Sequence, residues 1–206
     1  MAAYPIQRLL ALLLLALPAS AAAEGGEAVQ ERRFRPLHEL TLGIGWLPSD
    51  PYTKGLAGSV GYTLHLSDRW AWRVAEVGAV QGFPTNVRKD LTNNFAIGEE
   101  RFREARILAT SELMWEALYG RESFLNRGVL SMATIVSFGP AVAMMREGAE
   151  TTPNPGVALG LGWKLYVAEG WALRLEARDV IVVNGLEKPD HVIWLSMAGS
   201  YALGSR

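Results

Sequence analysis

The sequence predicts an all-β fold in which eight antiparallel strands run up and down and close into a barrel. Apolar residues alternate strictly with small or charged ones, as in residues 156–178, GVALGLGWKLYVAEGWALRLEAR. A period of two is typical of a strand with two different faces. The gap at residues 168–170, AEG, predicts a tight hairpin turn between two such strands. The lengths of the connections and the positions of the glycines favour the same fold.

Alternating residues predict the first three strands over residues 39–46, 56–66 and 70–76. Proline, serine and aspartate at residues 48–51 end the first strand, and a short polar turn ends the second. Beyond Glu76 the alternation slips, and such a slip indicates a β-bulge in the third strand.

The middle of the chain gives mixed signals. Residues 81–104 are polar and contain proline and asparagine, so we expect a long loop. Residues 105–118 are rich in Glu, Ala, Leu and Met, which favour a helix, but they also alternate, which favours a strand. We interpret this segment as the fourth strand. A turn is expected at residues 120–123 and a fifth strand over residues 128–142.

The last part of the chain predicts a second long loop over residues 143–155, followed by strands six and seven over residues 157–167 and 171–178. An Asn-Gly pair marks another loop before an eighth strand over residues 193–203. The connections are thus expected to alternate between long and short. Transmembrane barrels show this alternation, with short turns on the periplasmic side and longer loops outside.

Glycine gathers on the less apolar face of the predicted strands, at Gly43, Gly45, Gly61, Gly160 and Gly162. Glycine weakens a solvent-exposed strand, but it suits the crowded interior of a narrow barrel. We therefore expect this face to point inward and the apolar face to point outward toward lipid. The prediction is a transmembrane β-barrel.

Aromatic residues on the apolar face lie close to the short turns. Such rings form a girdle where a barrel crosses the interface of a membrane, whereas a buried core would scatter them along the strands. The predicted aromatic girdle consists of Trp70, Trp72, Trp115, Trp163, Trp171 and Tyr201.

Charged residues on the inward face would lie inside the barrel. Desolvated charges persist only when they are paired and hydrogen-bonded, so we expect an ionic network that fills the lumen instead of an open channel. The alternative is the ordinary solvated face of a soluble sheet. The predicted network consists of Arg73, Glu112, Lys164, Arg174, Glu176 and Arg178.

The N-terminus predicts export. Residues 9–17 form a short apolar run, and small residues in an A-x-A pattern follow it, as in a secretory signal peptide cleaved after Ala21 or Ala23. The predicted divisions of the chain are a signal peptide over residues 1–23, a flexible lead-in over residues 24–36 and a barrel domain over residues 37–206.

Composition narrows the class of protein. The chain has no cysteine, which excludes a disulfide framework and a cysteine-based metal site. Its net charge of −1 gives no reason to expect a nucleic-acid partner. Half of the residues are hydrophobic and seven are tryptophan, yet no apolar run reaches the length of a transmembrane helix. An exported chain of this kind is either a soluble β-rich domain or a membrane barrel.

Three stretches carry a resemblance to a known family: GLAGSVGYTLHLSDRWAWRV at residues 55–74, ELMWEALYGRESF at residues 112–124 and WKLYVAEGWALRLEARD at residues 163–179. The chain resembles the small outer-membrane β-barrel domain family, similar in type to the OmpA N-terminal barrel. The resemblance implies a monomer in the outer membrane of a Gram-negative bacterium. It also implies contact with outer-membrane lipid and lipopolysaccharide, and with the barrel-assembly machinery during biogenesis.

The sequence supports no catalytic, cofactor or metal site. His38, His65 and His191 are scattered without metal-ligand spacing, and no G-x-S-x-G nucleophile motif is present. We therefore expect a non-enzymatic barrel with a structural or surface-interaction role. The alternatives are a narrow pore, a lipid-modifying outer-membrane enzyme and a soluble periplasmic binder of the lipocalin type.

Overall fold

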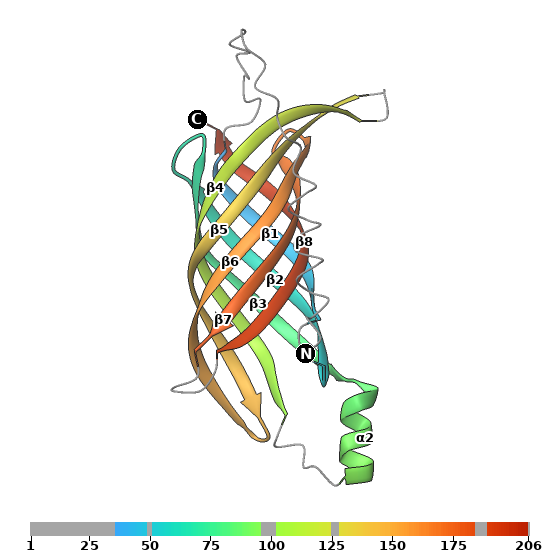
Figure 1. Ribbon diagram of the computed structural model, residues 1–206. Coiled ribbons are helices and arrows are strands. Elements are labelled where there is room, and N and C mark those ends of the chain that lie inside the picture. Colours follow the sequence, from blue (N-terminus) through green and yellow to red (C-terminus); the bar gives the residue numbers. More distant parts are fainter. Residues whose placement is uncertain (1–35, 49–50, 96–101, 125–127, 184–188, 206) are drawn as a thin grey trace, which may run out of the picture. The chain divides into compact units, whose positions relative to one another are not determined.

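The computed structural model describes residues 36–48, 51–95, 102–124, 128–183 and 189–205, which form eight strands and one helix (Figure 1). The elements are β1 (Pro36–Leu47), β2 (Thr53–His65), β3 (Trp70–Pro84), α2 (Asn86–Phe95), β4 (Arg103–Phe124), β5 (Gly128–Glu147), β6 (Glu150–Ala168), β7 (Trp171–Val182) and β8 (Asp190–Ser205). Each strand pairs antiparallel with the next, and β8 closes the barrel on β1. The predicted eight-stranded up-and-down barrel is confirmed. The predicted signal peptide and nearly all of the lead-in lie outside the described residues.

The apolar face of every strand points out of the barrel. On β1, Leu42 is 73% exposed while the neighbouring Thr41 is 2% exposed, and the alternation continues along the strand. The same outward face carries Val60 on β2 and Leu159 on β6. A soluble barrel has the opposite arrangement, with its apolar side chains inside. The structure is therefore a barrel of the transmembrane type, as the sequence predicts.

The two ends of the barrel differ. At one end, here called the turn end, β2 connects to β3 through residues 66–69 and β6 connects to β7 through residues 169–170. Gly170 has a φ of 75°, which the tight hairpin requires and which confirms the predicted turn. The other end, here called the loop end, carries the connections 48–52, 85–102, 148–149 and 183–189.

The expected long loop over residues 143–155 is wrong. β5 and β6 continue as a hairpin, in which Met144 pairs with Pro153 and Val142 pairs with Pro155, and a two-residue turn at residues 148–149 joins them. The pairing of β6 with β7 starts only at Gly156. Pro153 therefore lies on an edge outside the β6–β7 register, and Pro155 contributes only its carbonyl oxygen, which accepts the N–H of Val183 at 2.8 Å. The missing N–H groups break no second ladder.

β4 confirms the choice of strand over helix for residues 105–118. The turn expected at residues 120–123 is wrong, because β4 continues to Phe124 and pairs with β5 as far as Gly128. The pairing of β4 with β3 ends at Trp115, so this part of the hairpin extends past the rest of the turn end (Figure 1). Gly120, which favours a turn in the sequence, lies within this extended hairpin.

Residues 81–104 are also corrected. β3 runs to Pro84, α2 occupies Asn86–Phe95 and β4 begins at Arg103, so the expected loop holds a helix between two longer strands. Thr85 starts the helix: its carbonyl oxygen accepts the N–H of Lys89 at 3.1 Å, and its Oγ1 accepts the N–H of Arg88 at 3.4 Å.

In the described part of the chain, no helix has both the length and the apolar character that a membrane crossing needs.

β3 contains a bulge, but it lies between Arg73 and Glu76, whereas the slip in the alternation predicted it beyond Glu76. Arg73 pairs with Glu112 and Glu76 pairs with Thr110, so two residues of β3 oppose one residue of β4. The extra residue changes which positions point inward. Arg73 and Glu76 consequently both face the lumen, although they are three residues apart and strict alternation would place them on opposite faces.

Candidate functional site

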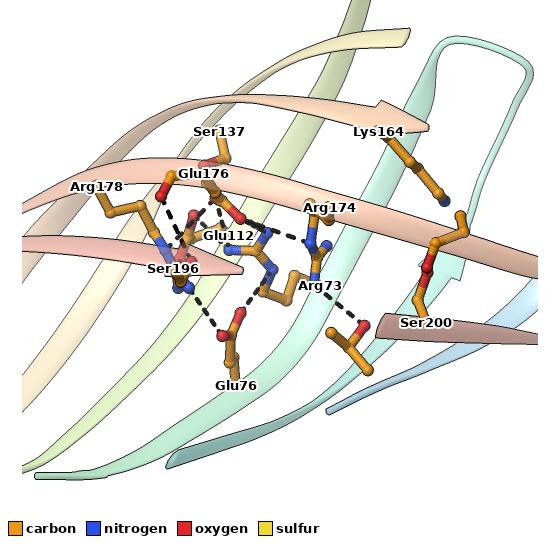
Figure 2. Close-up of polar contacts among 12 residues, drawn as sticks. Arg73, Glu76, Glu112, Ser137, Lys164, Arg174, Glu176, Arg178, Ser196 and Ser200 are labelled. Atoms are coloured by element: carbon orange, nitrogen blue, oxygen red, sulfur yellow. Dashed lines mark hydrogen bonds and ion pairs between the residues drawn. The ribbon is translucent and has the colours of Figure 1, made fainter. Parts of the chain in front are cut away.

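Six charged side chains meet inside the barrel and form what we call the central cluster (Figure 2). β3, β4 and β7 supply them from their inward faces, and each is at most 6% exposed. The central cluster consists of Arg73, Glu76, Glu112, Arg174, Glu176 and Arg178.

Arg73 is fully buried and contacts all three carboxylates. Its Nη1 donates to Oε2 of Glu112 at 3.0 Å, and its Nη2 donates to Oε2 of Glu176 at 2.8 Å. Its Nε lies 3.2 Å from Oε2 of Glu76. Because β3 and β7 are four strands apart in a barrel of eight, the Arg73–Glu176 pair crosses the lumen.

Arg178 makes a second set of contacts with the same carboxylates. Its Nη2 donates to Oε1 of Glu76 at 2.8 Å, and its Nη1 donates to Oε1 of Glu112 at 3.1 Å. The guanidinium carbon lies 4.2 Å from the ring centroid of Trp194, a cation–π distance. Glu76 and Glu112 therefore each bridge two arginines, which joins the pairs into one network.

Arg174 completes the charge balance. Its Nε lies 3.6 Å from Oε2 of Glu176, and its Nη2 donates to Oγ1 of Thr41 on β1 at 3.1 Å. Ser137 on β5 donates to Oε1 of Glu176 at 3.3 Å. Three guanidinium groups thus face three carboxylates. Such pairing offsets the cost of removing six charges from water.

Lys164 belongs to a separate group nearer the turn end. It donates to Oε2 of Glu39 on β1, and Nε2 of His65 lies 2.9 Å from the same oxygen atom. All three side chains are at most 9% exposed. The structure therefore places five of the six predicted network residues in the central cluster and Lys164 apart from them.

Three buried carboxylates of the interior, Glu39, Glu76 and Glu116, are missing from the predicted network. Glu76 follows the bulge in β3, where the alternation no longer shows which way a side chain points. Glu39 shares its face with Thr41, Gly43 and Gly45, and this alternation could have identified it as an inward-facing charge. Without these three residues the predicted network had four cations and two anions. Glu39 and Glu76 supply two carboxylates that pair with these cations.

Glycines make room for the large interior side chains. A Cβ atom on Gly160 would lie 2.3 Å from Oγ of Ser137 and 2.8 Å from Cγ of Arg178. A Cβ atom on Gly45 would lie 2.0 Å from Nε1 of Trp194. Both distances are far below van der Waals contact. Only glycine therefore fits beside the large side chains of Arg178 and Trp194.

Apolar side chains fill the lumen between the central cluster and the loop end. Trp194 is fully buried and separates the two regions, and a cavity of about 350 Å³ opens beyond the apolar region. Trp194 lies on the predicted inward face of its strand, but the pattern did not predict an apolar layer. The buried members of this layer are Leu47, Ala57, Val80, Leu108, Ala141, Ala143, Met145, Ala158, Val180, Val182, Val192 and Trp194.

The six residues of the predicted girdle all lie on the outer surface, with exposures between 40% and 53%. Four of them form two pairs near the turn end, because the rings of Trp70 and Trp115 are 6.2 Å apart and those of Trp171 and Tyr201 are 4.9 Å apart. Trp46, which the prediction left out, is 53% exposed at the opposite end of β1. The depth of these rings in a membrane stays a prediction.

The histidines have individual partners. Nδ1 of His38 lies 2.7 Å from the hydroxyl oxygen of Tyr62, and Nδ1 of His191 lies 2.8 Å from Oδ2 of Asp179. Within the described ranges, no three His, Cys, Asp or Glu side chains are grouped so that they could hold a metal ion. The polar chemistry that the structure shows in the lumen is that of fixed ion pairs between arginine or lysine and glutamate side chains.

A closed antiparallel barrel with an apolar outer face and a charged interior is the architecture of the small outer-membrane β-barrels. No protein-family model matches the chain, and no curated protein matches it.

Solved structures with a similar strand arrangement include Neisserial surface protein A (NspA), with a TM-score of 0.49 and 8% identity over 81% of this chain and 96% of that one. Ail, the attachment invasion locus protein of Yersinia pestis, has a TM-score of 0.38 and 11% identity over 80% of this chain and 95% of that one. A second Ail structure, in complex with the heparin analogue sucrose octasulfate, has a TM-score of 0.39 and 12% identity, with the same coverage.

Proposed function

We propose that this protein is a non-enzymatic barrel of the outer membrane of a Gram-negative bacterium, with a lumen closed by its own side chains and a structural or surface-interaction role. The outward apolar face of all eight strands carries the proposal, because such a surface is stable only against lipid or a large apolar partner. The turn end faces the periplasm and the loop end faces outside, since short turns lie on the periplasmic side of such barrels.

The partners follow from this placement. Outer-membrane lipid and lipopolysaccharide surround the barrel, and the barrel-assembly machinery inserts it. The protein acts as a monomer, because the closed sheet leaves no strand edge for a second copy in its wall. The loop end, which carries α2 and the charged side chains around it, supplies the surface for interactions outside the cell.

The membrane placement predicts a heat-dependent gel shift. Within the wall of the closed barrel every strand has a neighbour on both sides, so SDS has few backbone groups to attack until the sample is heated. Unboiled and boiled samples of the outer-membrane fraction are expected to migrate differently. Identical migration together with recovery in the soluble periplasmic fraction would support a soluble lipocalin-type binder instead.

The closed lumen predicts a very low conductance. The interior of an eight-stranded barrel is only wide enough for side chains, and here the central cluster and the apolar layer occupy it. Protein reconstituted in planar bilayers is expected to give no large, stable unitary conductance. A steady conductance of the porin type would contradict the closed lumen and support the narrow pore.

A further inference from the structure

The cavity of about 350 Å³ lies between the apolar layer of the lumen and the loop end, and we call it the loop-end cavity. The loop ends of β1, β2, β3, β4, β5 and β8 line it, together with Tyr52 and Phe102 from the connections. A cavity of this size is within the range of sites that bind small molecules. The proposed function gives it no role.

The inner part of the loop-end cavity is apolar. Four strands supply one side chain each from the apolar layer, Leu47, Val80, Met145 and Val192, and each is at most 8% exposed. Ala105 of β4 packs against the same layer and also lines the cavity. Water over such a surface finds few hydrogen-bonding partners, so a ligand with apolar surface that displaces it is favoured.

One wall of the loop-end cavity is aromatic. Phe102, directly before β4, is 7% exposed, and its ring centroid lies 5.5 Å from that of Tyr52, with 56° between the ring planes. The contact between the two rings holds this wall in place before a ligand arrives. A further aromatic ring can pack against such a wall in an offset or edge-to-face arrangement. The shape and chemistry of the wall therefore favour an aromatic ligand.

The charged side chains at the mouth of the cavity have charged partners in the protein. Nη1 of Arg103 donates to Oδ2 of Asp190 at 2.6 Å, and Oε2 of Glu104 lies 3.1 Å from Nη2 of Arg106. A charged ligand would have to compete with these pairs. A carboxylate that accepts one hydrogen bond keeps lone pairs for another donor, such as a hydroxyl or N–H group. The mouth therefore favours an uncharged ligand with one donor group.

We propose that the loop-end cavity binds an uncharged aromatic compound of one or two rings. Its ring lies against Phe102 and the apolar inner part, and its hydroxyl or N–H group points to the carboxylates of Asp190 and Glu104 at the mouth. The proposal goes beyond the structural or surface-interaction role. It depends on the closed barrel and its cavity and not on the placement of the barrel in a membrane.

The test uses 2-naphthol as the probe and 2-naphthoate as its charged counterpart. The full chain, with isotope-labelled leucine and valine methyl groups, is placed in lipid nanodiscs, and NMR spectroscopy follows each methyl signal as the probe is added. Leu47, Val80 and Val192 report on the cavity. Leu42, on the outward face of β1, reports on probe that only dissolves in the lipid. Binding to the cavity saturates, whereas partitioning into lipid does not.

Ala105→Phe tests the cavity directly, because the added ring occupies the space of the ligand. Ala109→Phe is the matched control: it is the same change on the same strand, but it lies on the outward face, where Ala109 pairs with the exposed Val142. The heat-dependent gel shift checks that each variant is folded. Ala105→Leu replaces Ala105→Phe if the larger side chain prevents folding.

The wild-type chain and Ala109→Phe are expected to bind 2-naphthol with saturable shifts of the three cavity methyl signals. Ala105→Phe should weaken this binding by at least about tenfold, since the site is filled. The wild-type chain should bind 2-naphthoate at least about tenfold more weakly than 2-naphthol, because a charge in an apolar site lacks a partner.

Two results would overturn the proposal: shifts that do not saturate or are confined to Leu42, and equal binding of 2-naphthol by the wild-type chain and the folded Ala105 variant. Equal affinity for 2-naphthoate and 2-naphthol would overturn the preference for an uncharged ligand.

Discussion

Arg73→Met is expected to destabilise the barrel by about 3–5 kcal/mol, because removing one partner of a buried ionic group leaves uncompensated charge. Arg73 contacts Glu76, Glu112 and Glu176, and methionine would fill much of its space without pairing with any of them. The measurement is the free energy of unfolding in urea for protein refolded into lipid vesicles. Arg69→Met, at an exposed turn position, is the matched control and should change stability little.

A second variant separates charge from packing. Glu112 contacts only Arg73 and Arg178 within the central cluster, so Arg73→Met combined with Glu112→Gln restores the balance of charges. The double variant is expected to recover part of the lost stability. If Arg73→Met is as stable as the parent, the central cluster does not act as one network. The same conclusion follows if Glu112→Gln lowers the free energy of unfolding as much on top of Arg73→Met as it does alone.

Leu161→Arg is expected to destabilise the barrel by about 2–4 kcal/mol, the cost of a cation on the lipid face near the bilayer midplane. Leu161 is on the outward face in the middle of β6, and it pairs with Val136 and Ala177. Val183→Arg, just past the end of β7 at the loop end, is the depth control and should cost only about 0–1 kcal/mol. Equal effects at the two positions would contradict a lipid-facing exterior.

The neighbouring residue tests the other face of the same strand. Gly160→Leu forces bulk against Ser137 and Arg178, and overpacking of this kind costs about 1–3 kcal/mol. Gly58→Leu is its control, because a Cβ atom on Gly58 would meet no atom within 4 Å. Urea unfolding and the heat-dependent gel shift report both variants. A Gly160→Leu variant as stable as Gly58→Leu would show that the lumen is not packed.

Much of this fold could be predicted from the sequence because its two environments differ so strongly. Lipid outside and paired charges inside impose a period of two on each strand. That period identified β1 and β7 with their faces, and it outweighed the helical composition of residues 105–118. The alternation along β4 and β7 likewise identified four charged residues of the interior, Glu112, Arg174, Glu176 and Arg178.

The errors fall where a strand is paired on one side only. β6 has no register with β7 before Gly156, and β4 has none with β3 beyond Trp115, so prolines and a glycine are tolerated there and resemble loops. α2 lies in a polar connection. Its helical signal is a single capping residue, Thr85, and one residue is too little to predict a helix. The pairing between particular charges, such as Arg73 with Glu176 across the lumen, depends on the closure of the barrel and is absent from any local pattern.

The most direct test of a lipid-facing exterior is the accessibility of a spin label at Leu42, the most exposed large apolar residue of β1. Because the chain contains no cysteine, Leu42→Cys gives a single labelling site, and Ser67→Cys in the β2–β3 turn gives a water-exposed control. In lipid vesicles, the label at position 42 should collide readily with oxygen and hardly with a water-soluble nickel chelate, while the label at position 67 should show the reverse. A label at position 42 that meets the nickel chelate as readily as the control, or that meets neither reagent, would contradict a barrel whose apolar face meets lipid.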